Sequence, residues 1–331
     1  MSDFKILSER DHLLLRPAMY IGAVTPTAVS GIINFEYQTK TVVPGLLKII
    51  NEIIDNAVDE YIRTNCKFAD TISVEIADCG LDGWSVSVAD NGRGIPVIKH
   101  DGQYQAELAW TRARAGSNFT DDGRTTIGMN GIGSFATNCF SQSFVGKSGD
   151  GTTMVTVDCH NNGEILSVNA RKNSHRGTSV TFFPDLSKFG ITDISQDHLD
   201  IIEDRLTNLA ICYPGIVFKF NGKKIQLKNH SQLAKSFHAD ALCFESENKN
   251  ALFVIAPAGA DEEFRFLSYF NGLDIKNGGS HIDYVLNTII AELIPSIKRK
   301  WKIEVLPNQI KQHLMFASWI HGFSNPKFDS Q

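Results

Sequence analysis

The chain has 331 residues, a length that suits two domains better than one. Hydrophobic residues make up 42% of it and charged residues 21%, which is usual for folded globular proteins and excludes extensive disorder. A net charge of −5 argues against a protein that coats nucleic acid by bulk electrostatics. The run Lys298-Arg299-Lys300-Trp301-Lys302 offers a local basic patch, although such runs are more often solvated turns.

Cysteine usage and the N-terminal sequence indicate the compartment. The six cysteines have no C-x-x-C pairing, so we expect reduced thiols and neither a disulfide framework nor a zinc site. The N-terminus lacks the basic-then-apolar order of a signal peptide, and no apolar run approaches bilayer length. We therefore expect a cytoplasmic protein without membrane contact, located in the host-cell cytoplasm if the protein is viral.

The first long element is a helix. Residues 1–22 form a lead-in, where Pro17 and Gly22 favour an arm or loop over a long helix. Pro44-Gly45 then begins a helix that runs to about Arg63. Apolar residues fall on one broad face of this helix, whereas an acid and an amide, Glu52 and Asn56, are stacked one turn apart on the other.

Two strands and two glycine loops follow the helix. The strands are predicted at 71–77 and 84–89, and the second alternates in the period-2 manner of a half-buried strand. It ends at Asp90, where the loop Asp90-Asn91-Gly92-Arg93-Gly94 begins. Residues 100–127 are polar and contain glycine, so we expect a mobile lid there. A second loop, Gly128-Met129-Asn130-Gly131-Ile132-Gly133, opens a helical stretch over 132–140.

The remaining pattern divides at Pro214-Gly215. Before it we predict strands at 153–158, 165–170 and 178–183 and a helix over 197–212. After it we predict a hairpin about Asn221-Gly222, a short helix near Ser231, strands at 251–256, 264–270 and 314–320, and a helix over 281–293. The pattern predicts an α+β protein with an arm over 1–22, a first domain over 23–213 and a second over 214–331.

The second glycine loop has the composition of a phosphate site. A nucleoside triphosphate carries about four negative charges, which backbone N–H groups, a cation and a metal must meet. Loop Gly128–Gly133, followed by a helix N-terminus, supplies the amides, and Gly131 and Gly133 would let the backbone approach the phosphates closely. The alternative is an ordinary glycine-rich turn.

The first loop suits a nucleobase. A carboxylate at a strand end, such as Asp90, can accept a hydrogen bond from an exocyclic amine like that of adenine. Gly92 and Gly94 would let the base lie against the backbone. The alternative is a capped β-turn, which Asp-Asn-Gly forms readily.

The helix supplies the remaining groups. Asn56 offers a neutral oxygen to Mg²⁺, which takes few protein ligands and keeps waters and phosphate oxygens. Glu52 can polarise a water for in-line attack on the terminal phosphate, and Lys48 can pair with Glu52 and hold its rotamer. The alternative, an exposed helix face, weakens because both glycine loops follow. His281 and Asp283 lack a third ligand and are interpreted as structural.

These pieces resemble the GHKL ATPases, and several segments resemble the type IIA DNA topoisomerases within that superfamily. The resemblance covers nearly the whole chain, and its mixture of bacterial-like and eukaryotic-like segments is similar to the bacteriophage branch. Its carriers are Arg16-Pro17-Ala18-Met19-Tyr20-Ile21-Gly22, Val43-Pro44-Gly45-Leu46, Asn51 to Ala57, Arg176-Gly177-Thr178, Phe270-Asn271-Gly272, Gly278 to Val285 and Asn325 to Gln331.

The resemblance implies a Bergerat-fold α/β sandwich followed by a smaller transducer domain of the ribosomal-protein-S5-like βαβ type. It implies an ATP-driven gate with ATP and Mg²⁺ as cofactors and a homodimer that closes on ATP. Other topoisomerase subunits and duplex DNA are the partners of the full enzyme. Glu52 would be the catalytic base, Asn56 the metal ligand and Lys48 a supporting residue. Among the other ATP-binding positions, Asp90 with Thr178 would lie at adenine, and Gly94 and Ile95 would line the base pocket. Ser117 and Asn118 would contact ribose or phosphate, and the loop would surround the phosphates with Gly128, Met129, Asn130, Gly131, Ile132 and Gly133. Arg93 and Gln331 would also bind ATP.

Two departures from the family pattern qualify this picture. The family motif that ends the transducer continues as Q-T-K, and its lysine reaches the γ-phosphate, whereas the sequence stops at Gln331. Phe135 occupies a position where eukaryotic relatives often carry lysine. We therefore expect an N-terminal gate fragment that binds ATP but turns over slowly. The alternatives are a GHKL clamp of chaperone or mismatch-repair type and a non-catalytic nucleotide-binding module.

Overall fold

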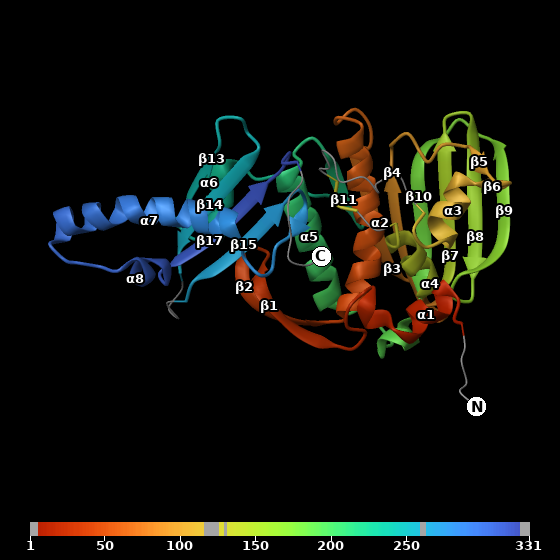
Figure 1. The fold of residues 1–331 in the computed structure, drawn as a ribbon, viewed down its shortest axis with the longest axis horizontal. Helices are drawn as coiled ribbons and strands as arrows, with labels where there is room; N and C mark the ends of the chain where they lie inside the picture. The colour runs from red at the N-terminus through yellow and green to blue at the C-terminus, as the bar shows by residue number, and fades with distance from the viewer. Residues whose placement is uncertain (1–5, 116–125, 129–130, 259–262, 325–331) are drawn as a thin grey trace.

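The computed structural model describes residues 6–115, 126–128, 131–258 and 263–324. The chain is organised around two β-sheets, with the long helices α2 (Pro44–Arg63) and α5 (Gln196–Cys212) lying between them (Figure 1). Among these residues no helix is long and apolar enough to cross a membrane.

The first sheet has eight strands in the order β12-β11-β3-β4-β10-β7-β8-β9. Helices α2, α3 (Gln105–Thr111) and α4 (Gly133–Cys139) pack against it, and α5 packs on β11. The strands are β3 (Thr71–Asp78), β4 (Trp84–Asp90), β7 (Ser141–Asp150), β8 (Thr153–His160), β9 (Glu164–Lys172), β10 (Arg176–Pro184), β11 (Val217–Phe220) and β12 (Lys223–Lys224).

The second sheet has five strands in the order β13-β14-β17-β15-β16. Strands β15 and β17 are parallel and joined through α7, which makes the predicted βαβ unit. The elements are β13 (Leu242–Glu245), β14 (Ala251–Pro257), β15 (Arg265–Phe270), β16 (Leu273–Asp274), β17 (Leu314–Ile320), α6 (His230–Phe237), α7 (Ser280–Trp301) and α8 (Pro307–Lys311).

Shorter elements complete the chain. A small hairpin of β5 and β6 precedes α3, and the N-terminal segment forms one short helix and a 3-10 turn where the sequence favours an arm or loop. These elements are α1 (Glu9–Leu15), η1 (Pro17–Met19), η2 (Gly80–Asp82), η3 (Leu186–Phe189), β5 (Lys99–His100) and β6 (Gln103–Tyr104).

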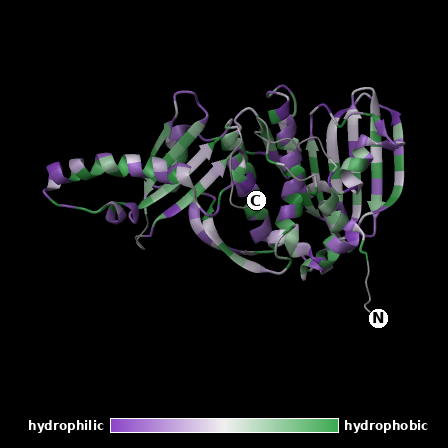
Figure 2. Cartoon of the chain, in the orientation of Figure 1, coloured by the Kyte–Doolittle hydropathy of each residue, from purple (hydrophilic) through white to green (hydrophobic). Residues whose placement is uncertain are grey.

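Helix α2 has the bounds that the sequence predicts. Pro44 stands in its first turn, where the missing N–H is harmless. Its apolar side is buried, with Ile49, Ile50 and Ile54 fully inaccessible, and Figure 2 shows both colours along the helix, as its two-sided composition requires. On another side, Asp55 accepts a hydrogen bond from Arg205 of α5 at 2.5 Å, a buried ion pair that joins the two central helices.

A hairpin of β1 (Thr27–Ile33) and β2 (Glu36–Val42) precedes α2, and the sequence pattern did not indicate it. Most of its side chains are exposed or half-buried, so the alternation is weak. Contacts far along the chain hold it in place: Asn34 N donates to Asp204 at 2.7 Å, and Lys40 pairs with Asp200 at 2.6 Å.

Three further segments differ from the predictions. The expected mobile lid over 100–127 is wrong for its described part, because α3 buries Trp110 against β7 at Gly146. Strand β7 was missed. Helix α7 continues past Pro295 to Trp301, well beyond the predicted end at 293.

The region after Pro214 bears on the predicted domain division. The hairpin about Asn221-Gly222 is confirmed, and both residues have positive φ, at 46° and 76°. Its first strand, β11, pairs in parallel with β3, so the first sheet extends to Lys224. The division at residue 214 therefore remains a prediction, and the hairpin that follows it adds to the first sheet.

Candidate nucleotide-binding site

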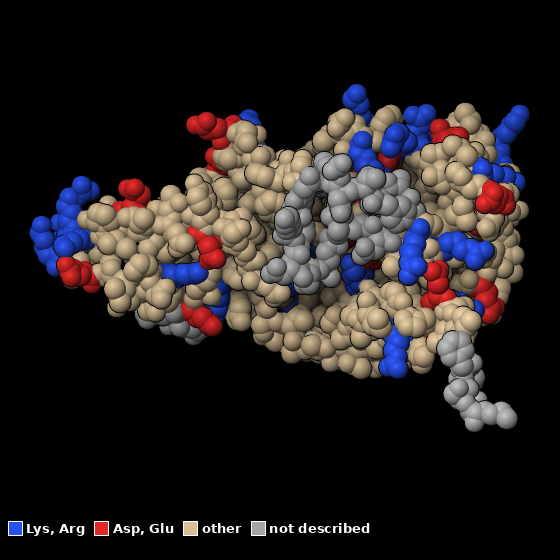
Figure 3. Space-filling model, in the orientation of Figure 1, with Lys and Arg blue, Asp and Glu red and all other residues tan. Residues whose placement is uncertain are grey.

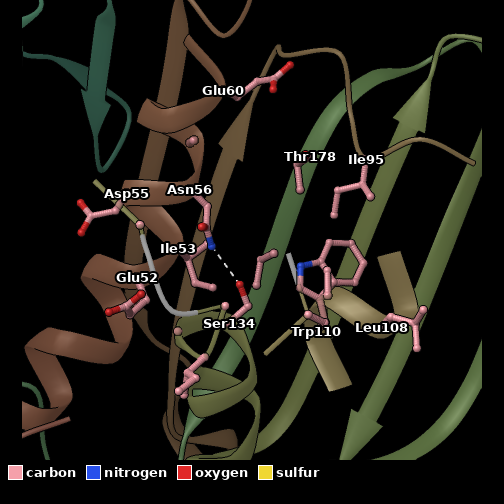
Figure 4. A pocket seen from close by; sticks show the side chains of 18 of the residues that line it. Glu52, Ile53, Asp55, Asn56, Glu60, Ile95, Leu108, Trp110, Ser134 and Thr178 are labelled. Atoms are coloured by element: carbon pink, nitrogen blue, oxygen red, sulfur yellow. Dashed lines mark hydrogen bonds between the residues drawn. The ribbon is translucent and has the colours of Figure 1, made fainter. Parts of the chain in front are cut away.

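A cavity of about 1110 Å³ opens between α2 and the first sheet. Its walls come from the polar side of α2, the loop after β4, strand β10 and the start of α4 (Figure 4). Leu273 of the second sheet also lines it. This volume suits a ligand larger than a typical drug molecule.

The polar side of α2 brings the predicted acid and amide to the cavity. Glu52 lines it and pairs with Lys48 at 2.5 Å, as the sequence predicts. Asn56 lies one turn on and donates from its Nδ2 to Ser134 Oγ at 2.8 Å (Figure 4). Because Ser134 takes up the amide nitrogen, the carboxamide oxygen is the atom left to meet a hard cation.

The start of α4 lies directly against Glu52. A Cβ added at Gly133 would overlap the Glu52 carboxylate, so only glycine lets the loop backbone come this close. Phe135, two residues further along, is buried in the core and offers no cation to the cavity. The expectation that this loop holds phosphate mainly through backbone N–H groups stays a prediction.

Replacing Gly133 with alanine should impair hydrolysis more than folding. The new Cβ meets the far end of a flexible side chain, which can swing aside, so the free energy of unfolding should change little. If Glu52 is the general base that the sequence predicts, displacing its carboxylate by about 1 Å should slow ATP hydrolysis roughly 10²-fold. Phosphate-release kinetics and thermal unfolding would be compared with Gly31→Ala, where an added Cβ has no neighbour within 4 Å. Equal hydrolysis by the two variants would contradict the placement of Glu52.

Another wall of the cavity is built around Asp90 at the end of β4, where adenine is expected from the sequence. Its Oδ1 accepts from Gly92 N at 2.7 Å and from Thr178 N of β10 at 3.3 Å. Burial raises the pKa of Asp90 to about 6, although both hydrogen bonds oppose the shift. The carboxylate is thus mostly ionised at neutral pH and partly dehydrated. Its Oδ1 accepts both backbone hydrogen bonds, and Oδ2 accepts neither of them.

The loop after Asp90 runs close against the sheet. Gly94 has a φ of 77°, and a Cβ there would overlap the backbone carbonyl of Gly149. The next residue, Ile95, donates its N–H to the buried Ser148 Oγ at 2.6 Å. These contacts fix Gly94 and Ile95 as one wall of the cavity.

Arg93 is held by an acid of α2. Its Nε donates to Glu60 Oε1 at 2.8 Å and its terminal nitrogen to Glu60 Oε2 at 3.2 Å, a two-pronged pairing. Its backbone N–H also donates to Glu60, at 3.1 Å. Arg93 therefore lines the cavity, and its hydrogen bonds to Glu60 fix its position there.

Known proteins resemble this chain in sequence. A model of the histidine kinase-, DNA gyrase B- and HSP90-like ATPases matches residues 41–188. The DNA topoisomerase large subunit of Enterobacteria phage T4 is 41% identical over the whole chain. The chain is therefore similar to a DNA topoisomerase large subunit along its whole length.

Solved structures agree over both domains. The ATPase and transducer domains of DNA topoisomerase II from Balamuthia mandrillaris match with a TM-score of 0.86 and 28% identity, covering 99% of this chain and 87% of that one. The ATPase region of Saccharomyces cerevisiae topoisomerase II matches with a TM-score of 0.85 and 26% identity, over 100% and 89%. The chain is thus a GHKL ATPase fold with a transducer domain. It spans 63% of the length of the phage T4 subunit.

The structure brings most of the predicted site residues of this topoisomerase ATPase region into one cavity, while their roles stay predictions. Ser117, Asn118, Met129, Asn130 and Gln331 lie outside the described residues. The residues that line the cavity are Lys48, Glu52, Asn56, Asp90, Arg93, Gly94, Ile95, Gly128, Gly131, Ile132, Gly133 and Thr178.

Sequence reasoning missed three side chains that shape this site. Asp59 and Glu60 lie on the same helix as the predicted residues, and Glu60 follows Asn56 at i+4, a spacing that offered a signal. Asp59 accepts hydrogen bonds from Ile127 and Gly128, whereas Ser134 contacts Asn56. No sequence signal pointed to these last two pairings, because their partners lie more than 60 residues away.

Two other predicted features have structural explanations. His281 Nε2 lies 2.8 Å from Ser268 Oγ, and Asp283 pairs with Lys311, so both remain structural. Across the described ranges no group of three or more His, Cys, Asp or Glu could hold a metal. The basic run at 298–302 ends α7, and its side chains gather at the outer tip of that helix (Figure 3).

Proposed function

We propose that this chain is the ATP-binding and ATP-hydrolysing gate of a type IIA DNA topoisomerase. The observation that carries the proposal is the shared cavity. In support, Glu52, Asn56 and Gly133 line the same cavity as Asp90, a half-buried carboxylate whose chemistry suits adenine. The T4 subunit that it resembles is named as part of a DNA topoisomerase. A clamp of chaperone or mismatch-repair type gains no support, because both domains match topoisomerase structures.

The cavity suits ATP with Mg²⁺. Asn56 would hold the ion through its oxygen, and the other ligands would be water and phosphate oxygens. When bound, the ion would neutralise phosphate charge. Glu52 would accept the proton of the attacking water, with Lys48 holding its rotamer. Asp90 would accept a hydrogen bond from the exocyclic amine of adenine. The site would be completed by Ser117, Asn118, Met129, Asn130 and Gln331.

In the whole enzyme, ATP binding would close a homodimer, and that closure would drive passage of one DNA duplex through another. Duplex DNA and further topoisomerase subunits would be its partners. Nucleotide binding would be the first of these steps, so it is the step to test in the chain itself.

The experiment is calorimetry with a non-hydrolysable ATP analogue, with Mg²⁺ and again with a chelator in its place. We expect saturable binding that weakens when the metal is removed. Sedimentation of the 36.6 kDa chain should then show a species of twice that mass with the analogue and Mg²⁺. Failure to bind the analogue at millimolar concentration would refute the proposal. Binding without any change in mass would refute the gate alone.

A further inference from the structure

Asp59 clamps the segment that leads into the phosphate loop. It lies on α2 one turn beyond Asn56 and is 1% exposed. Its Oδ1 accepts from Ile127 N at 2.6 Å, and its Oδ2 accepts from Gly128 N at 2.9 Å. Both carboxylate oxygens are therefore used on two consecutive backbone N–H groups.

Keeping this carboxylate buried costs free energy. Burial raises the pKa of Asp59 to about 7, and the negative charge of Asp55 acts in the same direction. The two backbone N–H groups and Arg63 oppose the shift. A neutral residue would avoid this cost, so the clamp favours a role in positioning the loop over one in stabilising the fold.

The same segment contacts the second domain. Ile127 is buried against the turn between β15 and β16, where Gly272 has a φ of 80°. A Cβ at Gly272 would lie 2.8 Å from Ile127 Cδ1 and 3.2 Å from the Tyr213 ring. The next residue of that turn, Leu273, lines the nucleotide cavity.

The turn is also tied to the end of β17. Asn271 N donates to Ile320 O at 2.7 Å, and its Nδ2 donates to Phe323 O at 2.6 Å. Phe323 N returns a hydrogen bond to Asn271 Oδ1 at 3.3 Å. A displacement of the turn must therefore also move the chain that leaves the second sheet.

We propose that Asp59 is a positioning residue for the phosphate loop, and that the 126–128 segment it holds is the joint through which the loop and the second domain move together. The inference rests on the proposed nucleotide site. It differs from contact with the nucleotide, because Asp59 acts through the backbone of Ile127 and Gly128. If a bound phosphate displaced Gly128, the neighbouring Ile127 would shift with it. The side chain of Ile127 would then displace the turn at Gly272, which it contacts.

The first test replaces Asp59 with asparagine. The amide keeps the volume, but its NH₂ faces a backbone N–H, so one of the two hydrogen bonds is lost. We expect the affinity for a non-hydrolysable ATP analogue with Mg²⁺ to fall about tenfold. Thermal unfolding above pH 8 should not show a comparable loss, because a buried charge is removed.

The matched control is Asp204→Asn. Asp204 is also buried, has a pKa raised to about 7 by burial, and accepts a backbone N–H from Asn34, but its hydrogen bonds go to Asn34 and Asn208 and not to the 126–128 segment. Its variant should bind the analogue as the wild type does. Equal affinities for the two variants would overturn the inference. If the wild-type chain itself fails to bind, the proposed function falls and the inference falls with it.

The second test is a double-mutant cycle at the joint. Gly272→Ala should weaken analogue binding several-fold, and adding Ile127→Val should restore part of the loss, because it removes Cδ1, the nearest atom. The control is Gly222→Ala, which has a φ of 76° and open space around the added Cβ, so it reports backbone strain alone. If Gly272→Ala behaves as Gly222→Ala does, or if Ile127→Val gives no recovery, the joint does not exist.

Discussion

Replacing Glu52 with glutamine should lower ATP hydrolysis by roughly 10²- to 10⁴-fold while nucleotide binding persists. Glutamine has the shape of glutamate but cannot accept the proton of an attacking water. Glutamine keeps the contact with Gly133 at the start of α4, and its amide oxygen can still accept a hydrogen bond from Lys48, although the ion pair is lost. Phosphate release under saturating ATP measures the rate, and calorimetry with the analogue measures binding.

A control separates this effect from a general loss of negative charge. Glu203→Gln removes an exposed acid from α5, away from the cavity, and should hydrolyse ATP at the wild-type rate. If Glu52→Gln keeps wild-type turnover, the water must be activated by another group. If the Glu52→Gln variant loses nucleotide affinity together with turnover, Glu52 maintains the structure of the pocket and has no separate catalytic role.

Replacing Asp90 with asparagine should weaken ATP binding roughly 10²-fold. Gly92 N and Thr178 N both donate to Oδ1, so the amide oxygen must stay at that position. The NH₂ group then faces the exocyclic amine of adenine, and donor meets donor. Guanine presents a carbonyl at the corresponding position, so the preference for ATP over GTP should fall. Calorimetry with both nucleotides checks this, and an unchanged preference would place adenine elsewhere.

The same carboxylate predicts how binding depends on pH. Burial raises the pKa of Asp90 to about 6. Oδ1 accepts from two backbone N–H groups, so a proton would sit on Oδ2, and the protonated Oδ2 is a much weaker acceptor for the adenine amine. Affinity for the analogue should therefore be constant above about pH 7 and should fall as the pH drops through 6. The asparagine variant has no proton to gain there, so its affinity should lack this step. A wild-type profile that is flat from pH 5 to 8 would contradict the assignment.

Much of the nucleotide site was predictable because its parts are local in sequence. The period of apolar residues gives α2 its buried side, and that side leaves Lys48, Glu52 and Asn56 on the other. A period-2 strand delivers Asp90 at its end. Glycine at 94 and 133 was expected to let the backbone approach a base and a phosphate, and that approach stays a prediction. The structure gives a different reason for glycine, because the Gly149 carbonyl and the Glu52 carboxylate stand where the side chains would be.

The missed elements share a different cause. Hairpin β1–β2 has mostly exposed or half-buried side chains, so its alternation is weak, and its position depends on Asp204 and Asp200 of α5. Helix α3 lies within a polar stretch that did not predict a helix. The burial of Trp110 against Gly146 packs this helix onto the core. Here contacts with distant segments outweighed local composition.

The amino-acid order alone therefore specified which helix and loops form the site, because periodicity and glycine placement act within a few residues. Only the tertiary structure decided that Asp59 receives the N–H groups of Ile127 and Gly128, and that Leu273 of the second sheet reaches the cavity. Partners of this kind are chosen by how whole sheets and helices pack. No local pattern records which N–H group, 68 residues away, a buried carboxylate will meet.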